Sequence, residues 1–184
     1  PYEAAAKAGV GTFMASFNEI NGVPATGDRW LMTDILRGEW GFRGFVVSDY
    51  TGVNELVPHG FAEDEQHAAE LAVNAGIDMD MTGATFIKYL TQSVEEGKVP
   101  EQTIDNAARR ILEMKFLLGL FDDPYRYLNE ERARKNSMTP EFMETARKAV
   151  AASVVLLKNE NNLLPIPKET AVTLALVGPL MNDS

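Results

Sequence analysis

Apolar residues in this chain form short runs with strand propensity that alternate with longer stripes at helical spacing. The strand-like runs begin at Thr12, Phe45 and Ile77, which lie 33 and 32 residues apart. One strand and its following helix need about 30 residues. The pattern therefore predicts a βα repeat with a parallel sheet and outer helices, as in a barrel or a doubly wound fold. A closed (β/α)8 barrel needs about 200 residues or more, so three units can form only part of one.

Turn and cap residues define where the elements begin and end. Helices are expected over residues 2–8, 28–38, 64–76, 83–96, 100–118 and from 139 onward. Strands are expected over residues 12–17, 45–47, from 77, 154–157 and 172–177, with a polar loop over 18–27. The charged, aperiodic stretch between the last two helices has the composition of a linker. Because the chain starts in what resembles the end of a helix, we expect it to be part of a longer protein.

Charge and composition exclude several classes of function. The net charge of −10 disfavours binding to nucleic acid or to an anionic membrane surface, both of which require clustered Lys and Arg. The absence of cysteine excludes thiol catalysis, disulfides and cysteine-based zinc sites. The chain also contains no apolar run of about 20 residues, the length needed to span a bilayer.

Asp49 is the main candidate for chemistry. It follows the apolar run 45–47 and Ser48, at the expected carboxyl end of a buried strand. In α/β folds this end of the sheet opens onto the ligand site, where a nucleophile or base is often placed. Asp and Ser are also favoured helix caps, so the position alone is equally consistent with a cap. Tyr50, beside Asp49, suits contact with a sugar ring or simple packing at the rim.

Other polar residues carry weaker signals. Asp78 and Asp80 end the third expected strand and could hold Mg²⁺, although capping and rim hydrogen bonds are the favoured interpretation. His59 and His67 have no metal-binding spacing, so solvation or local hydrogen bonding is expected. The loop after Asp49 also carries three glutamates, one of which could serve as an acid: Glu55, Glu63 and Glu65.

Several stretches of the chain, in order, resemble glycoside hydrolase family 3. They are residues 14–24 (MASFNEINGVP), 36–44 (LRGEWGFRG), 47–50 (VSDY), 75–79 (AGIDM), 155–159 (VLLKN) and 164–165 (LP). The resemblance covers nearly the whole chain. It implies a (β/α)8-like barrel followed by an α/β sandwich domain. Residues 1–121 would be the C-terminal part of the barrel domain, 122–139 a linker and 140–184 the beginning of the sandwich.

The resemblance also implies a function, that of a retaining β-glucosidase in the periplasm. Asp49 would be the catalytic nucleophile, and Tyr50, Met14 and Phe17 would contact the sugar. Many members have tyrosine where this chain has Phe17, so the hydrogen bond from that hydroxyl to the nucleophile is not expected here. The substrate would be a β-glucoside or a short β-gluco-oligosaccharide, and no metal or cofactor would be required.

Two elements of that machinery are expected outside these 184 residues: the acid/base, a Glu beyond Ser184, and the upstream sugar-binding residues. We therefore expect the chain alone to be inactive, with its exposed edges covered by self-association or by the rest of the parent protein. Two other functions remain open. A non-catalytic α/β ligand-binding module would use Asp49 for hydrogen bonding, and a Mg²⁺-dependent barrel enzyme would use Asp78 and Asp80.

Overall fold

The computed structural model describes residues 1–169, 173, 175, 177, 178 and 181. These residues divide into two units, Pro1–Leu128 and Asn129–Ser184. The first unit contains, in chain order, α1 (Tyr2–Lys7), β1 (Thr12–Ala15), β2 (Glu19–Ile20), β3 (Val23–Pro24), η1 (Ala25–Gly27), η2 (Trp30–Glu39), β4 (Phe45–Ser48), η3 (Asn54–Leu56), α2 (Glu65–Ala75), α3 (Thr85–Glu95) and α4 (Glu101–Leu117). The second contains α5 (Glu130–Asn136), α6 (Pro140–Ser153) and η4 (Glu160–Asn162).

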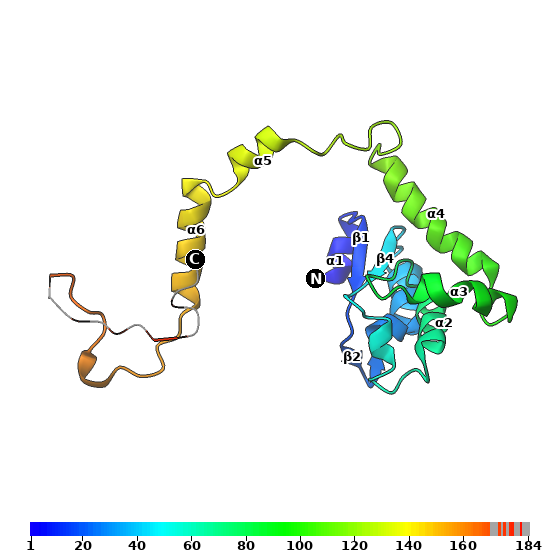
Figure 1. The fold of residues 1–184 in the computed structure, drawn as a ribbon, viewed down its shortest axis with the longest axis horizontal. Helices are drawn as coiled ribbons and strands as arrows, with labels where there is room; N and C mark the ends of the chain where they lie inside the picture. Colours follow the sequence, from blue (N-terminus) through cyan, green and yellow to red (C-terminus); the bar gives the residue numbers. More distant parts are fainter. Residues whose placement is uncertain (170–172, 174, 176, 179–180, 182–184) are drawn as a thin grey trace. The chain divides into compact units, whose positions relative to one another are not determined.

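A parallel pair of strands, β1 and β4, forms the centre of the first unit, and Figure 1 shows the two strands side by side. Thr12 pairs with Phe45 and Ala15 pairs with Ser48. The third strand, predicted to begin at Ile77, is reduced to a single parallel bridge between Val47 and Met79. The predicted parallel arrangement is therefore confirmed as a mixed α/β fold, but the barrel is not closed within the described residues.

The core lies between this sheet and the helices that follow it. Val46, Leu56 and Ile77 are fully buried and belong to one apolar cluster. Small side chains on α2, including Ala68 and Ala72, belong to this cluster and let that helix pack closely against η1 and η3. A second cluster, which includes Leu90, joins α2 to α3, and Figure 1 shows these helices next to each other.

Predicted cap residues position α2. The Asp64 carboxylate accepts a hydrogen bond of 2.8 Å from the backbone N–H of His67, which satisfies a free donor in the first turn. Gly76 ends the helix with φ at +118°, a left-handed conformation that favours glycine. The chain then turns directly into Ile77 and runs alongside β4, where Met79 pairs with Val47.

Two local structures in the first unit differ from the prediction. The expected helix over 28–38 is present as η2, but it has π-type hydrogen bonding, as in the bond from the Trp40 N–H to the Ile35 carbonyl. Within the loop predicted over 18–27, β2 and β3 form a short antiparallel hairpin. Asn21 and Gly22 both have positive φ at its turn, which is the geometry that an Asn-Gly pair favours.

The second unit also departs from the prediction. Its helix α6 begins where expected, with the Thr139 hydroxyl accepting from the N–H of Phe142, but α5 lies inside the stretch predicted as a linker. The prediction of a strand over 154–157 is wrong, because these residues form no helix and pair with no strand among the described residues. Of the strand expected over 172–177 the structure describes only 173, 175 and 177, so that prediction lies outside the described residues.

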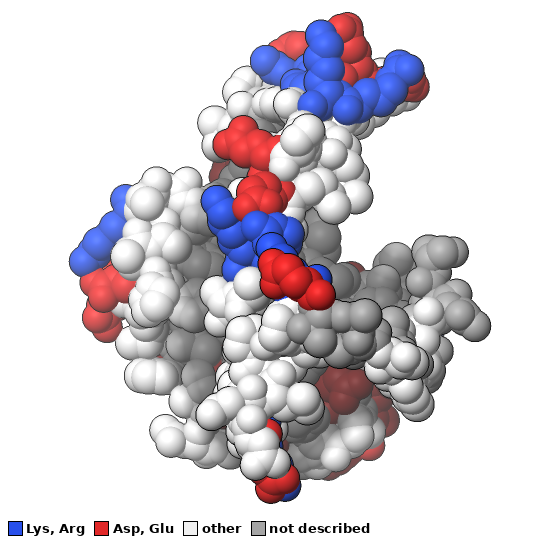
Figure 2. Space-filling view, turned by 90° about the vertical axis from the view of Figure 1, so that its left-hand side faces the viewer, with Lys and Arg blue, Asp and Glu red and all other residues white. Residues whose placement is uncertain are grey.

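Charged side chains of both signs lie next to one another on the face of the molecule shown in Figure 2. On α5 this mixing takes the form of pairs one helical turn apart, Glu130 with Arg134 and Glu131 with Lys135. Such pairs stabilise an exposed helix that has little apolar periodicity. Among the described residues no helix has both the length and the apolar character needed to cross a membrane.

Candidate functional site

Asp49 lies directly after β4 and is held there by the main chain. Its backbone N–H donates to the Ala15 carbonyl at 2.9 Å, which extends the β1–β4 ladder by one step. On the other side of β4, the Ser48 N–H donates to the Met79 carbonyl at 2.9 Å. The position of Asp49 is therefore fixed from two neighbouring segments.

Side-chain alternation along β4 determines which way Asp49 faces. Val46 and Ser48 are fully buried beneath the helices, whereas Val47 points to the opposite, less covered face of the sheet. Continuing the alternation places Asp49 on the same face as Val47. Met14 and Met79 are the partners of Val47 in the pairing register, so they lie on that face as well.

The Asp49 carboxylate has one hydrogen-bond partner among the described residues. Its Oδ1 accepts from the Tyr50 backbone N–H at 2.7 Å. It caps no helix, because η3 begins only at Asn54 and has Val53 at its cap position. One carboxylate oxygen is thus left without a hydrogen bond from the described part of the chain, and the half-buried side chain can meet a ligand.

The residues predicted to contact a sugar are exposed apolar side chains near this end of the sheet. The exposed fractions are 65% for Tyr50, 52% for Met14 and 39% for Phe17. The structure brings Met14 and Tyr50 close to Asp49 through strand pairing and chain continuity. Phe17 follows the end of β1, and no interaction between Phe17 and Asp49 is seen. Apolar and aromatic surface beside a carboxylate is typical of sites that bind the less polar face of a sugar.

Ser48 is a site residue that the sequence interpretation missed. Its hydroxyl donates to the carbonyl of Asp49 at 2.9 Å and accepts from the Met81 N–H at 2.8 Å. The Thr51 N–H in turn donates to the Met81 carbonyl at 3.0 Å. These bonds tie the turn after Asp49 to the segment that follows Ile77. A buried serine next to the candidate nucleophile was the only signal in the sequence.

The three loop glutamates differ in their surroundings. Glu65, at the start of α2, accepts from the Tyr89 hydroxyl at 3.0 Å and from the Asn54 side-chain amide at 2.9 Å. These hydrogen bonds, first from Tyr89 and then from Asn54, lower the pKa of Glu65. A lowered pKa favours the ionised form, which is the wrong state for a general acid. Glu63 is exposed and Glu55 is half-buried.

Asp78 serves a structural ion network and is not arranged as a metal ligand. Its side chain is only 1% exposed and contacts Arg37 at 2.5 Å and Arg110 at 2.6 Å. It also accepts a hydrogen bond of 2.8 Å from the Val46 N–H. Because Val46 lies one residue after the start of β4, this network is at the opposite end of the strand from Asp49.

Asp80 is used separately, at the start of α3. Its Oδ2 accepts from the Thr85 N–H at 2.7 Å and from the Thr85 hydroxyl at 2.8 Å. Within the described ranges no group of three or more acidic, histidine or cysteine side chains is arranged to hold a metal ion. The structure therefore favours the capping interpretation of Asp80 over a shared Mg²⁺ site with Asp78.

His67 makes a local hydrogen bond, whereas His59 contacts a residue far away in the sequence. The Nδ1 atom of His59 lies 2.9 Å from Glu19 Oε1, and the Nδ1 atom of His67 accepts from the Glu63 N–H at 3.2 Å. These contacts join the β2–β3 hairpin and the start of α2 to the loop after Asp49.

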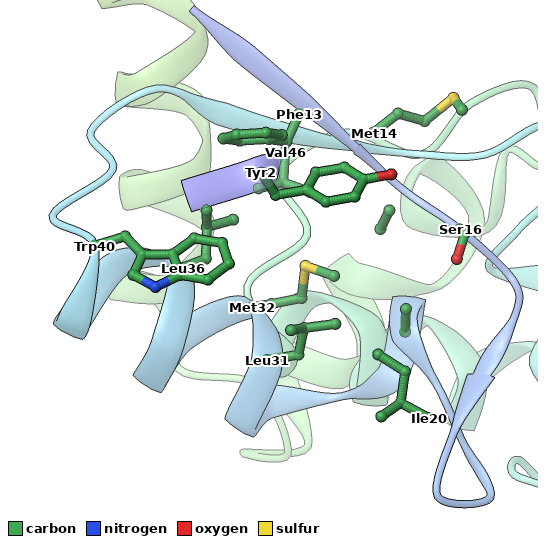
Figure 3. A pocket seen from close by; sticks show the side chains of 12 residues that line it. Tyr2, Phe13, Met14, Ser16, Ile20, Leu31, Met32, Leu36, Trp40 and Val46 are labelled. Atoms are coloured by element: carbon green, nitrogen blue, oxygen red, sulfur yellow. The ribbon is translucent and has the colours of Figure 1, made fainter. Parts of the chain in front are cut away.

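An apolar pocket of about 200 Å³ lies between η2 and the sheet, and Asp49 is not among the residues that line it. Figure 3 shows Leu36 and Met32 of η2, and Trp40 just after it, facing Phe13, while Met14 projects from the other side of β1. Almost every lining side chain is apolar, whereas sugar binding requires several polar groups to hydrogen-bond the hydroxyls. We therefore interpret this pocket as a gap in helix–sheet packing and not as the sugar site.

Comparison of the chain with known proteins identifies a matching family and several related proteins. Residues 1–114 match the family described as the glycosyl hydrolase family 3 N terminal domain. The chain is 42% identical to a periplasmic beta-glucosidase of Salmonella typhimurium, covering 100% of this chain and 24% of that protein. It is 40% identical to a putative beta-xylosidase of Formosa agariphila, again covering 100% of this chain and 24% of the relative.

Solved structures that resemble this chain include those of a beta-glucosidase. The beta-glucosidase of Listeria innocua in complex with glucose matches with a TM-score of 0.73 and 42% identity, over 90% of this chain and 22% of that one. A mutant of that enzyme in complex with laminaribiose matches with a TM-score of 0.74 and 42% identity, over 91% of this chain and 23% of that one. The chain thus spans about a quarter of the length of these relatives.

Proposed function

The chain belongs to glycosyl hydrolase family 3, and from this premise we propose that it supplies the nucleophile, Asp49, of a retaining β-glucosidase. The observation that carries the proposal is the placement of Asp49. A main-chain ladder fixes it at the carboxyl end of β4, on the sheet face shared with Met14, with one carboxylate oxygen free of hydrogen bonds from the described residues. The family supports glycoside hydrolysis as the reaction class.

In the proposed reaction, the free oxygen of Asp49 attacks the anomeric carbon of a β-glucoside. A second carboxyl group protonates the departing oxygen, and a covalent glycosyl-Asp49 ester forms. Water then hydrolyses the ester with overall retention, which requires the two carboxyl groups to lie about 5–5.5 Å apart. The Tyr50 N–H donates to Oδ1 and so orients the carboxylate, while the other oxygen remains available to attack.

The second carboxyl group is proposed to come from outside these 184 residues. Glu65 is engaged by Tyr89 and Asn54 as an ionised acceptor, so it is poorly suited to deliver a proton. The relatives are about four times longer than this chain, which leaves ample sequence to supply the acid and further sugar contacts. We also propose a periplasmic location, by similarity to the Salmonella relative.

Glucose is proposed over xylose as the sugar, although relatives of both names match. The Listeria enzyme, whose structures contain glucose and laminaribiose, shares 42% identity with this chain. The two sugars differ in the hydroxymethyl group at C5. Comparing kcat/KM for nitrophenyl β-glucoside and nitrophenyl β-xyloside in the full-length protein tests this choice.

The test of the nucleophile uses the full-length protein that contains this chain. Asp49→Ala should lower kcat/KM for nitrophenyl β-glucoside by about 10³-fold or more, equivalent to about 4 kcal/mol of barrier. A 2-deoxy-2-fluoroglucoside should form a stable ester, and peptide mass spectrometry should locate it on Asp49. Glu63→Ala, which changes an exposed loop carboxylate, serves as the matched control. Normal turnover by Asp49→Ala would refute the proposal and favour a ligand-binding module.

A further inference from the structure

A second pocket, of about 240 Å³, lies at the opposite end of β4 from Asp49. It lies between the turn that precedes β4 and the middle of α4. Four arginines line it: Arg37, Arg43, Arg109 and Arg110. We call this feature the arginine pocket. This cluster of positive charge is unusual because the chain as a whole has a net charge of −10.

Positive charge in the arginine pocket exceeds the negative charge available to it. Arg37 and Arg110 share a single carboxylate, that of Asp78. Arg43 and Arg109 are exposed, and their side chains make no hydrogen bond or ion pair within the described part of the chain. Glu113 is the one acidic residue in the lining itself, so four guanidinium groups face two carboxylates.

Arg37 shows the effect of this excess. Its Nε–H is buried and has no hydrogen-bond partner among the described residues. Burial lowers the pKa of the Arg37 guanidinium, Asp78 opposes that shift, and the positive charge of Arg110 lowers it further. The guanidinium groups of Arg37 and Arg110 repel each other, and an anion bound nearby would stabilise their positive charge.

We propose that the arginine pocket binds a phosphate-like oxyanion through Arg43 and Arg109, with Arg110 and the Asn106 amide at its inner side. A guanidinium presents parallel N–H donors that match two oxygens of such an anion, and arginine is preferred wherever phosphate is recognised. The pocket volume exceeds that of one phosphate, so the anion can enter with part of its hydration shell. Binding would join the turn before β4 to α4.

This inference goes beyond the proposed function and does not depend on it. The pocket contains none of the residues assigned to sugar hydrolysis, and its occupancy is measured by binding and not by turnover. The probe is inorganic phosphate, titrated by calorimetry into the full-length protein while NaCl is adjusted to keep the ionic strength constant. The expected result is a saturable isotherm with one site.

The variant Arg43→Gln/Arg109→Gln should weaken phosphate binding by about tenfold or more, because it removes two charge-assisted contacts. The control Arg134→Gln/Arg147→Gln removes the same charge from exposed, paired arginines of α5 and α6 and should bind as the wild type does. Arg37 and Arg110 stay unchanged because Asp78 requires them. Equal binding by all three proteins, or no saturable binding at constant ionic strength, would overturn the proposal.

Crystallography provides a test that needs no variant. Crystals of the full-length protein soaked in selenate should show an anomalous peak between Arg43 and Arg109. Selenate bound elsewhere, with this pocket empty, would also overturn the inference.

Discussion

At the scale of single residues, the aspartates at the two ends of β4 differ in their contacts. Asp49 follows the carboxyl end and keeps a free oxygen, whereas Asp78 is fully engaged near the amino end by two arginines and the Val46 N–H. The placement of Asp49 at the end of a strand could be predicted from its position after an apolar run. The Asp78 network could not, because Arg37, Asp78 and Arg110 are far apart in the sequence and no local pattern pairs them.

Asp78→Asn should strongly destabilise the protein. The substitution removes the carboxylate charge while Arg37 remains largely buried, with its side chain 12% exposed. Leaving a buried charge without its partner costs about 3–5 kcal/mol. Urea denaturation of the full-length protein measures the loss, and Asp105→Asn on the exposed side of α4 is the matched control. A loss below about 1 kcal/mol would show that the network contributes little.

Glu65 should make stability depend on pH. Because hydrogen bonds from Tyr89 and Asn54 lower its pKa in the folded state, its stabilising effect is complete above the pKa of the unfolded chain. The effect is then lost as the pH falls through the lower, folded pKa. The stability difference between wild type and Glu65→Gln should therefore shrink between about pH 6 and about pH 3.

The control for this experiment is Glu101→Gln, which changes an exposed carboxylate at the start of α4. Chemical denaturation at each pH gives the two differences directly. A difference for Glu65→Gln that stays constant or grows on acidification would contradict the assignment.

At the scale of elements, caps and apolar spacing predicted the helices well. Asp64, Gly76 and Thr139 mark ends that the structure confirms. Elements with weak apolar signals were missed: α5 is held by charged pairs, and the β2–β3 hairpin is only two residues long on each side. The third predicted strand forms only a single bridge to β4. The length of a strand depends on which neighbouring strands it can pair with, and the spacing of apolar residues along the sequence does not reveal those neighbours.

The close approach of β1 and β4 depends on Gly44. A Cβ atom at this position would collide with the backbone carbonyl oxygen of Gly11, just before β1. Backbone cannot rotate away as a side chain can, so Gly44→Ala should push the strands apart. We expect a loss of about 2–4 kcal/mol in stability and a drop in activity of the full-length protein.

Gly41→Ala is the control for Gly44→Ala in the same turn. A Cβ at Gly41 meets no atom within 4 Å, although its φ of +69° carries its own smaller cost. Differential scanning calorimetry should rank Gly44→Ala as clearly the less stable of the two. The reverse order would show that strand spacing is not limited by this contact.

At the scale of the whole molecule, the first unit leaves surfaces uncovered. In the described structure β1 pairs only with β4, so one of its edges has free N–H and C=O groups. On α4, the side chains of Leu112, Phe116 and Leu117 are each more than half exposed. Apolar surface of this kind normally contacts another part of a protein or a partner.

The isolated 184-residue chain should therefore self-associate and should not hydrolyse nitrophenyl β-glucoside. Loss of the general acid alone removes about 10²–10⁴-fold in rate, and loss of substrate positioning removes more. Size-exclusion chromatography with light scattering and a standard colorimetric assay test both statements. Turnover by a monomer would mean that a carboxylate within this chain, such as Glu55, delivers the proton.

The backbone ladder on both sides of β4 has an evolutionary consequence. Since main-chain bonds from Asp49 to Ala15 and from Ser48 to Met79 hold this segment, the position of the proposed nucleophile does not depend on the identity of the exposed side chains around it. Mutations at Met14 or Tyr50 can then reshape what the site accepts without displacing the carboxylate. If Asp49 has the proposed role, a lineage built on this scaffold can change its sugar preference in single steps while each intermediate remains catalytically active.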